Sequence, residues 1–547
     1  MGRLDIKLFI SQKNTTVGDI EGNFEILKKS FKNAVSKNCD FFITPELSLT
    51  GYPAQDLLLR KDFIKKINFF KKKIYDLTKK NKTIFALSIP TLSNGSIFNS
   101  LLLIQSGKIV YSIQKNELPN YGVFDERRYF VSPNQSNKYF VYKKKKIQFL
   151  ICEDMWSDNF SKKKSNIRLD LIIVINASPF ETGKFTLRKA LAKKRIQHYQ
   201  CELVYINTIG SQDDLIFDGG SFCMNKYGNI IFQEKFFDES EAIIDLSKKI
   251  EKTKIKKIDD LELLYRALMV GLRSYMLKNG FSFAHLGLSG GIDSALTLTI
   301  LADTIESKNI SSFFLPSKFS SKQSKEDAYK LSSNLGIKTT EISIEMLRKN
   351  LSSELKPLFK NLKEDLTEEN IQSRLRGIIL MALSNKFNSL LITTGNKSEL
   401  AVGYSTLYGD MCGGYSLLKD VYKTRVFELC NWRNKNILNE FKIKKNNIIP
   451  EEIIKKEPTA ELRYDQKDSD ILPPYKTLDK ILSLLIDENR SLEFAIKKGF
   501  SKNTVKKIWK MIKNSEFKRY QSSIGPKVTK MSLSADRRFP ITNKFDL

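Results

Sequence analysis

A charged segment divides this sequence into two α/β patterns, which limits the folds that the chain can adopt. Residues 238–257 are rich in Asp, Glu and Lys and contain no aromatic residue. Short apolar strands alternate with amphipathic helices on both sides of it, which is typical of layered α/β domains. We therefore predict domains at residues 1–245 and 258–547, joined by a linker at 246–257. The length of 547 residues agrees, because single cores stop growing at roughly 250–300 residues.

The first half contains a series of short apolar strands and at least one amphipathic helix. The helix has an apolar face that runs from Phe24 to Val35. The predicted strands cover residues 4–10, 41–44, 83–89, 100–105, 109–114, 147–151, 171–176 and 203–207. Two of these strands lie close together around Ser106-Gly107, which predicts a hairpin and therefore mixed rather than purely parallel sheets.

Three polar residues of the first half, Glu46, Lys115 and Cys152, each come within two residues of the end of a predicted strand. The carboxyl ends of strands are where α/β folds gather their chemistry. A cysteine attacks an amide carbonyl when a nearby base accepts its proton, and Glu46 can act as that base. Lys115 can stabilise the resulting oxyanion. The three residues therefore predict an amidase that needs no histidine, which suits a chain with two histidines.

Together with their neighbours, these residues resemble the nitrilase superfamily of Glu-Lys-Cys amidases. The matching segments are residues 45–52, 115–126 and 152–154. The resemblance implies an α-β-β-α sandwich for the first domain. It also implies that Glu126 is a second glutamate, which hydrogen-bonds the lysine and supports glutamine hydrolysis.

The second half contains a phosphate-binding type of loop, Ser289-Gly290-Gly291-Ile292-Asp293-Ser294, between a predicted strand at 284–288 and a helix. Glycines allow the backbone to approach a phosphate closely, and the helix N-terminus presents free N–H groups to it. Asp293 can hold a magnesium ion. No lysine follows as a Walker loop requires, and the loop instead resembles that of the ATP pyrophosphatases, which leave AMP on a substrate.

Further strands in the second half are predicted at residues 312–315, 339–344 and 390–394. Helical patterns separate them, which is the βαβ arrangement of a doubly wound, Rossmann-like parallel sheet. An amidase joined to an adenylating domain predicts an amidotransferase, which frees ammonia from glutamine and passes it to an activated carboxylate. The start Met1-Gly2 argues against the asparagine synthetases, which use an N-terminal cysteine. The scarcity of histidine argues against the Cys-His-Glu glutaminase of the GMP synthetases.

Motifs of the second half resemble the glutamine-dependent NAD⁺ synthetases. They lie at residues 369–374, 393–399, 404–410, 419–424, 458–462 and 516–519. The resemblance implies that deamido-NAD⁺, ATP and glutamine are converted to NAD⁺, AMP, pyrophosphate and glutamate, with Mg²⁺ accompanying ATP. It implies a homo-oligomer of two or more subunits.

The same resemblance implies a role for individual residues. Those implied to bind glutamine are Tyr121, Ser178 and Lys184. Those implied to bind ATP are Gly287, Leu288, Ser289, Gly290, Gly291, Ile292, Asp293, Ser294, Thr394, Lys423 and Thr459. Those implied to bind deamido-NAD⁺ are Asn370, Arg374, Glu399 and Lys518, and the implied magnesium ligands are Asp293 and Glu399.

Charge and cysteine usage restrict partners and compartment. The formal net charge is +30, but lysine is spread along the whole chain, so we expect no nucleic-acid partner. The six cysteines form no CxxC pair, which favours a reducing compartment. No apolar run approaches the ~18 residues of a membrane span, and the N-terminus leaves no room for a signal peptide, so we expect a cytoplasmic protein. A tRNA-modifying adenylating enzyme and an amidase with a regulatory ATP-binding module stay open as alternatives.

Overall fold

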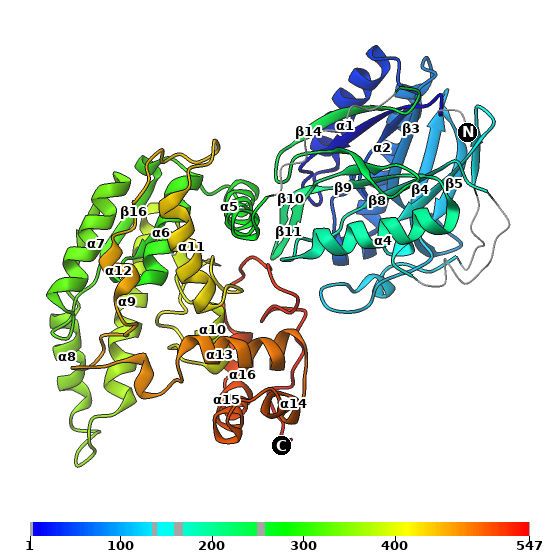
Figure 1. The fold of residues 1–547 in the computed structure, drawn as a ribbon. Helices are drawn as coiled ribbons and strands as arrows, with labels where there is room; N and C mark the ends of the chain where they lie inside the picture. Colours follow the sequence, from blue (N-terminus) through cyan, green and yellow to red (C-terminus); the bar gives the residue numbers. More distant parts are fainter. Residues whose placement is uncertain (1–3, 134–138, 158–167, 249–257, 546–547) are drawn as a thin grey trace. The chain divides into compact units, whose positions relative to one another are not determined.

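The computed structural model describes residues 4–133, 139–157, 168–248 and 258–545. The chain forms two compact units, Met1–Asp259 and Asp260–Leu547 (Figure 1). Of the linker expected at 246–257, residues 249–257 lie outside the described residues. The first part of the charged segment is a strand, β14 (Ser240–Asp245), which pairs antiparallel with β1 (Lys7–Gln12). Successive side chains of β14 point to opposite faces of the sheet, and that of Ile244 is buried. A charged composition therefore does not prevent this edge strand from forming.

The described part of the first unit contains two six-stranded mixed sheets. The first has the order β14-β1-β2-β3-β4-β5, with β2 (Phe41–Ile43), β3 (Ile84–Ser93), β4 (Ser96–Gln105) and β5 (Lys108–Gln114). The second has the order β13-β12-β9-β8-β7-β6, with β6 (Phe140–Tyr142), β7 (Lys145–Ile151), β8 (Leu171–Asn176), β9 (Glu202–Asn207), β12 (Phe222–Met224) and β13 (Ile230–Gln233). A small ribbon pairs β10 (Ile209–Gln212) with β11 (Leu215–Asp218). The antiparallel pairing of β4 and β5 confirms the predicted hairpin.

Three apolar layers hold the first unit together. The inner faces of the two sheets share one core, which includes Ile43 and Ile151. Helices α1 (Ile20–Ser36) and α2 (Lys61–Thr78) cover the first sheet through residues such as Phe31. Helix α4 (Lys184–Tyr199) covers the second sheet through Ala192 and Ile196. The unit is therefore the expected α-β-β-α sandwich, stabilised by about 1.5–3 kcal/mol for each large apolar side chain that it buries.

The second unit is built on a five-stranded parallel sheet. Its order is β17-β16-β15-β18-β19, with β15 (Phe283–Gly287), β16 (Ile310–Phe314), β17 (Thr339–Glu341), β18 (Ser389–Thr393) and β19 (Tyr415–Ser416). All strand pairs of this sheet among the described residues are parallel, which confirms the doubly wound α/β fold. The order reverses between β15 and β18, and such a switch point opens a crevice at the carboxyl ends of the strands.

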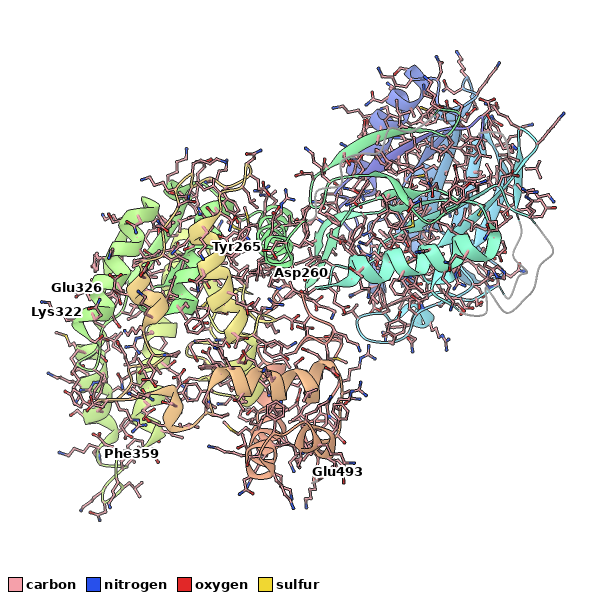
Figure 2. All side chains as sticks on the ribbon, viewed as in Figure 1. Asp260, Tyr265, Lys322, Glu326, Phe359 and Glu493 are labelled. Atoms are coloured by element: carbon pink, nitrogen blue, oxygen red, sulfur yellow. The ribbon has the colours of Figure 1, made fainter. Side chains whose placement is uncertain are left out.

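Helices cover the sheet of the second unit. The main ones are α5 (Asp260–Lys278), α6 (Ile292–Thr304), α7 (Lys322–Leu335), α9 (Leu366–Phe387) and α11 (Lys423–Lys435). Helix α6 begins directly after the glycine loop and is buried on every side, which fixes the loop in front of the sheet. Helix α7 is one-sided: it buries Ala328 and Leu331, whereas Lys322 and Glu326 form an exposed pair 3.7 Å apart (Figure 2).

A helical layer at the C-terminal end supports the short helix α10 (Lys397–Val402). The helices of this layer are α13 (Tyr475–Leu482), α14 (Leu492–Lys497), α15 (Lys502–Asn514) and α16 (Glu516–Tyr520). Two further helices, α8 (Glu345–Leu355) and α12 (Glu451–Lys455), lie elsewhere in the unit. Lys397 is buried and lies 2.9 Å from Asp420 and 2.7 Å from Asp487, which ties α10 to its surroundings. No helix among the described residues is long and apolar enough to span a membrane.

Candidate active sites

Glu46, Lys115 and Glu126 form a buried charge cluster in the first unit. The Lys115 Nζ donates to Glu46 Oε1 and to Glu126 Oε1, each at 2.8 Å. Burial lowers the pKa of Lys115, but the two carboxylates outweigh this and hold it well above its ordinary value. Burial raises the pKa of Glu126 to about 7, although Lys115 opposes the shift. Lys115 is therefore a fixed cation, and the second glutamate holds it in place.

Glu46 has further donors that the sequence did not reveal. Asn99 Nδ2, on β4, donates to Glu46 Oε1 at 2.8 Å, and the backbone N–H of Ala177 donates to Oε2 at 3.1 Å. The side chain of Glu46 has no exposure to solvent. These contacts fix the carboxylate in one orientation, which a general base requires.

Cys152 begins a 3₁₀ turn, η3 (Cys152–Met155), at the end of β7. Its φ of 46° lies in the left-handed region, which is strained for a residue with a Cβ and recurs at functional sites. Burial raises the pKa of the thiol well above its ordinary value, and the charge of Glu46 raises it further. The resting side chain is therefore a neutral thiol, and it needs a base to become a nucleophile.

Asp154 joins the turn of Cys152 to the loop of Lys115. One of its oxygens accepts from the backbone N–H groups of Asn116 and Glu117, at 3.0 and 2.8 Å, and the other accepts from Ile151 at 3.2 Å. The acid is buried, so these hydrogen bonds are protected from water. Asp154 therefore sets the spacing between the proposed nucleophile and the lysine.

The residues expected to bind glutamine fall in two places around this cluster. The exposed Tyr121 donates its hydroxyl to Glu153 at 3.0 Å. Lys184 lies 3.4 Å from Glu181, and its charge also acts on the carboxyl of Glu153. Tyr121 and Lys184 thus gather around Glu153, which the sequence prediction did not include.

Ser178 lies deeper, directly beside a buried ion pair. Its Oγ accepts from Arg188 Nε at 3.2 Å, and Arg188 also donates to both oxygens of Asp218, at 2.7 and 2.8 Å. Arg188 further donates to the backbone carbonyls of Ser178 and Pro179. The ion pair therefore holds the segment after β8 against the cysteine site, because Ala177 of that segment binds Glu46.

In the second unit, a cavity of about 290 Å³ lies at the switch point of the sheet. The expected ATP residues that line it are Gly287, Leu288, Ser289, Gly291, Ile292, Asp293, Ser294, Thr394, Lys423 and Thr459. Gly290 does not line it. Its φ is +81°, and a Cβ there would lie 2.3 Å from the carbonyl oxygen of Ser324, so only glycine fits between the loop and α7.

Asp293, Glu399 and Lys423 meet at one wall of this cavity. Lys423 Nζ donates to Asp293 Oδ2 and, at 3.0 Å, to Glu399 Oε1. Burial alone would lower the pKa of Lys423, but the two carboxylates raise it. Asn396 joins the cluster by donating Nδ2 to Asp293 Oδ1 at 2.9 Å. The described residues contain no group of three or more His, Cys, Asp or Glu side chains that could hold a metal.

Three of the residues expected to bind deamido-NAD⁺ surround the loop at residues 403–407 rather than line the cavity. Thr406 donates to Asn370 at 2.8 Å, and Arg374 donates to the carbonyl of Leu407 at 3.3 Å. Lys518 donates to the carbonyls of Gly403 and Ser405, at 2.9 and 2.7 Å. Thr406 and Tyr404 of this loop line the cavity, and so does Glu399, the fourth expected residue.

The cavity also contains charged residues that the sequence prediction missed. Arg376 lines it from α9, and burial lowers its pKa to about 10. Glu461 accepts from the hydroxyls of Ser321 and Ser324, at 2.8 and 2.6 Å, and so joins the segment around Thr459 to the start of α7. Lys456 donates to Glu461 at 3.2 Å. The local sequence does not indicate the contacts of Arg376 and Glu461, because their partners Leu315, Ser321 and Ser324 are distant in the chain.

A buried Cys-Glu-Lys site in one unit and a glycine loop at the switch point of the other define a class of protein: an amidotransferase that couples an amidase to a nucleotide-binding unit. Comparison with known families agrees. The model of the carbon-nitrogen hydrolases matches residues 9–254, and that of NAD synthase matches residues 264–522.

Full-length relatives identify the family. The chain is 41% identical to the glutamine-dependent NAD⁺ synthetase of Acinetobacter baylyi and 40% identical to that of Synechocystis, over 98% of both chains in each case. The structure of the glutamine-dependent NAD⁺ synthetase from Acinetobacter baumannii in complex with ADP matches 98% of each chain at 37% identity, with a TM-score of 0.78. This chain belongs to the family of glutamine-dependent NAD⁺ synthetases.

Proposed function

We propose that this protein converts deamido-NAD⁺ to NAD⁺, with glutamine as the source of nitrogen and ATP as the source of energy. Glutamate, AMP and pyrophosphate are the other products. One observation carries the proposal: the chain contains both a buried Cys152-Glu46-Lys115 site and a glycine loop at a sheet switch point, so a single polypeptide can perform both halves of the reaction. The full-length relatives that carry this name support it.

In the first unit, Glu46 takes the proton of Cys152 as the sulfur attacks the amide carbon of glutamine. The carbonyl oxygen becomes an oxyanion, and Lys115 stabilises it as a fixed cation in a dry site. Glu46 then returns its proton to the nitrogen, ammonia leaves, and a thioester remains on Cys152. Water, activated by Glu46, hydrolyses the thioester and releases glutamate. Tyr121, Ser178 and Lys184 are the residues that we propose to hold glutamine.

In the second unit, the carboxylate of deamido-NAD⁺ attacks the α-phosphate of ATP, and pyrophosphate leaves. Ammonia then attacks the acyl-adenylate carbon, and AMP leaves with the oxygen that had joined it to the carboxylate. The glycine loop and the N-terminus of α6 present N–H groups toward the cavity, where phosphate oxygens can accept them. A solved relative bound to ADP supports this use of the cavity. We propose that Asn370, Arg374, Glu399 and Lys518 position deamido-NAD⁺.

Magnesium fits the residues at the cavity wall. Mg²⁺ is usually held by one or two carboxylates together with substrate phosphates, rather than by a complete protein cage. Asp293 and Glu399 supply two carboxylates beside the glycine loop, which agrees with the lack of a larger acidic group among the described residues. We propose that these two residues hold the ion, which would neutralise charge that develops on the leaving pyrophosphate.

We also propose that the protein forms an assembly of two or more identical subunits in the cytoplasm and does not depend on nucleic acid. Exposed apolar side chains support the assembly: on α8, the chain that leads to α9 and the first residue of α9, the side chains of Met346, Leu358, Leu362 and Leu366 are 63–76% exposed. Figure 2 labels Phe359 in the same segment. Light scattering measures the mass, and a monomer at micromolar concentration would contradict the assembly.

The direct test of the proposed function is AMP release by the purified chain. With ATP and glutamine, AMP should appear only when deamido-NAD⁺ is present, in equal amount to NAD⁺. An enzyme that hydrolyses glutamine without any consumption of ATP would instead be a regulated amidase. AMP release that requires tRNA would indicate the RNA-modifying alternative.

A further inference from the structure

The ammonium group of Lys423 occupies the space between the two carboxylates that we propose as magnesium ligands. It donates to one oxygen of Asp293 and to one oxygen of Glu399. The Lys423 side chain is only 3% exposed, and those of Asp293 and Glu399 are 16% and 17% exposed. Water therefore does little to weaken either ion pair.

The remaining oxygens of the two carboxylates also have donors. Asn396 donates its side-chain amide to Asp293 Oδ1 at 2.9 Å, and its backbone N–H faces Glu399 Oε2 at 3.5 Å. Magnesium requires oxygen atoms that are free to coordinate it. In the described arrangement, a cation can reach both carboxylates only if the ammonium of Lys423 moves away.

Lys423 can make this movement without a change in the fold. Its backbone N–H donates to Ser398 Oγ at 2.9 Å, and its Cα belongs to the first turn of α11, so the main chain is anchored. The four-carbon side chain is flexible and ends in a compact charge that can exchange partners. Lys423 and both carboxylates line the same cavity as the glycine loop. The phosphates of a nucleotide in that cavity would offer the ammonium a new set of anionic partners.

We propose that Lys423 keeps the metal site closed until ATP binds, so that magnesium enters only together with the nucleotide. The inference rests on the proposed function for the identity of the nucleotide. Two carboxylates and one ammonium leave a single negative charge, which attracts a divalent ion weakly. When the ammonium shifts to the phosphates, the two carboxylates and the phosphate oxygens together form the usual environment of Mg²⁺. The exchange prevents the chain from accumulating metal without substrate.

The test is the affinity of the full chain for Mn²⁺, the probe ion, in the absence of nucleotide. Electron paramagnetic resonance of free Mn²⁺ reports binding without any need for turnover. Lys423→Met removes the ammonium but keeps the length of the side chain. The variant should bind Mn²⁺ roughly tenfold more tightly than the wild type. This figure corresponds to an ammonium that occupies the site in about nine-tenths of the wild-type molecules, so that only about one-tenth of them can bind the ion.

Two matched variants separate competition from a general effect of charge. Lys456→Met removes an ammonium from the same cavity, but Lys456 pairs with Glu461 and not with the two metal-ligand candidates. It should bind Mn²⁺ as weakly as the wild type. Asp293→Asn added to Lys423→Met should remove the gained affinity, since one of the two carboxylates is lost.

Tight binding of Mn²⁺ to the wild type without nucleotide would overturn the inference, and so would equal affinity in Lys423→Met and the wild type. Equal gains of Mn²⁺ affinity in Lys423→Met and Lys456→Met would show that the loss of any positive charge near the cavity has the same effect. That result would also overturn the inference. Circular dichroism verifies folding, and Lys423→Gln replaces the methionine variant if the latter does not fold. A chain that binds Mn²⁺ as predicted but forms no NAD⁺ would refute the proposed function and leave this inference standing.

Discussion

The Nζ of Lys115 lies 2.8 Å from Oε1 of Glu46, and neither side chain has any exposure to solvent. A buried ion pair is stabilising only when its remaining polar atoms are also satisfied. Glu126, Asn99 and the backbone of Ala177 provide these partners. The pair is therefore organised before any substrate arrives, and this is the feature that an enzyme needs in order to stabilise charge in a transition state.

Cys152→Ala should abolish NAD⁺ formation from glutamine but leave formation from added ammonium salts. Cys152 belongs to the first unit, whereas the cavity and its glycine loop belong to the second. The two rates are measured side by side with deamido-NAD⁺ and ATP in excess. Equal loss with both nitrogen sources would show that the two activities are not divided between the units.

Alkylation of Cys152 by iodoacetamide should be slow at neutral pH and should still rise between pH 9 and 10. An ordinary thiol levels off above its pKa of about 8.5, but burial and the charge of Glu46 raise the pKa of Cys152. Glu46→Gln removes that negative charge, so the pKa should fall and the alkylation profile should move to lower pH. Mass spectrometry of the Cys152 peptide measures the rate. A plateau near pH 7 in the wild type would mean that the resting residue is a thiolate.

Gly290→Ala should remove NAD⁺ formation from either nitrogen source and spare glutamine hydrolysis. The new Cβ would lie 2.3 Å from the Ser324 carbonyl oxygen at a φ of +81°, so the loop must shift away from α7 and change the shape of the phosphate-binding turn. Gly336→Ala is the matched control, because its φ is also positive, at +65°, a Cβ there meets no atom within 4 Å, and Gly336 does not line the cavity. The control should keep most of its activity. Similar losses of NAD⁺ formation in both variants would mean that the contact with Ser324 is not the cause of the loss.

Arg188→Met should destabilise the first unit by about 3–5 kcal/mol, since it leaves the carboxylate of Asp218 buried without its partner. Arg188 and Asp218 are fully buried or nearly so. Hydrogen exchange of the slowest amides in β8 and α4 measures the change in this unit. Arg128→Met, which breaks an exposed pair with Asp56, should leave the same amides almost unaffected. A small effect of Arg188→Met would show that the pair does not hold the segment after β8.

Much of the fold follows from local sequence patterns. Strand β8 was predicted with its observed bounds, and β15 was predicted to within one residue, because continuous apolar runs bounded by polar loops are a strong local signal. Strand β19 was missed, since two residues carry no periodicity. The short strand β14 was hidden in a charged segment, and its place in the sheet depends on its pairing with β1.

The supporting residues of the sites were harder to predict, for a physical reason. Asn99 is a polar residue inside an apolar strand, and nothing near it in the sequence indicates that it donates to a carboxylate 53 positions away. Arg188 looks like one of several basic residues on α4, yet it is buried against Asp218. Such long-range contacts are set by the assembled fold. The roles assigned to Asn370, Arg374 and Lys518 came from family resemblance alone and stay predictions.

We propose that one chain frees ammonia from glutamine and delivers it to activated deamido-NAD⁺. Free ammonia is mostly protonated at neutral pH, so we expect it to pass internally, within a subunit or between subunits. The measurement is the isotopic composition of NAD⁺ formed from amide-¹⁵N glutamine in a buffer with excess unlabelled ammonium. If ammonia passes internally, the carboxamide nitrogen of the product should be mainly ¹⁵N. NAD⁺ that carries mainly unlabelled nitrogen would show that the ammonia released from glutamine mixes with the solvent before it reacts.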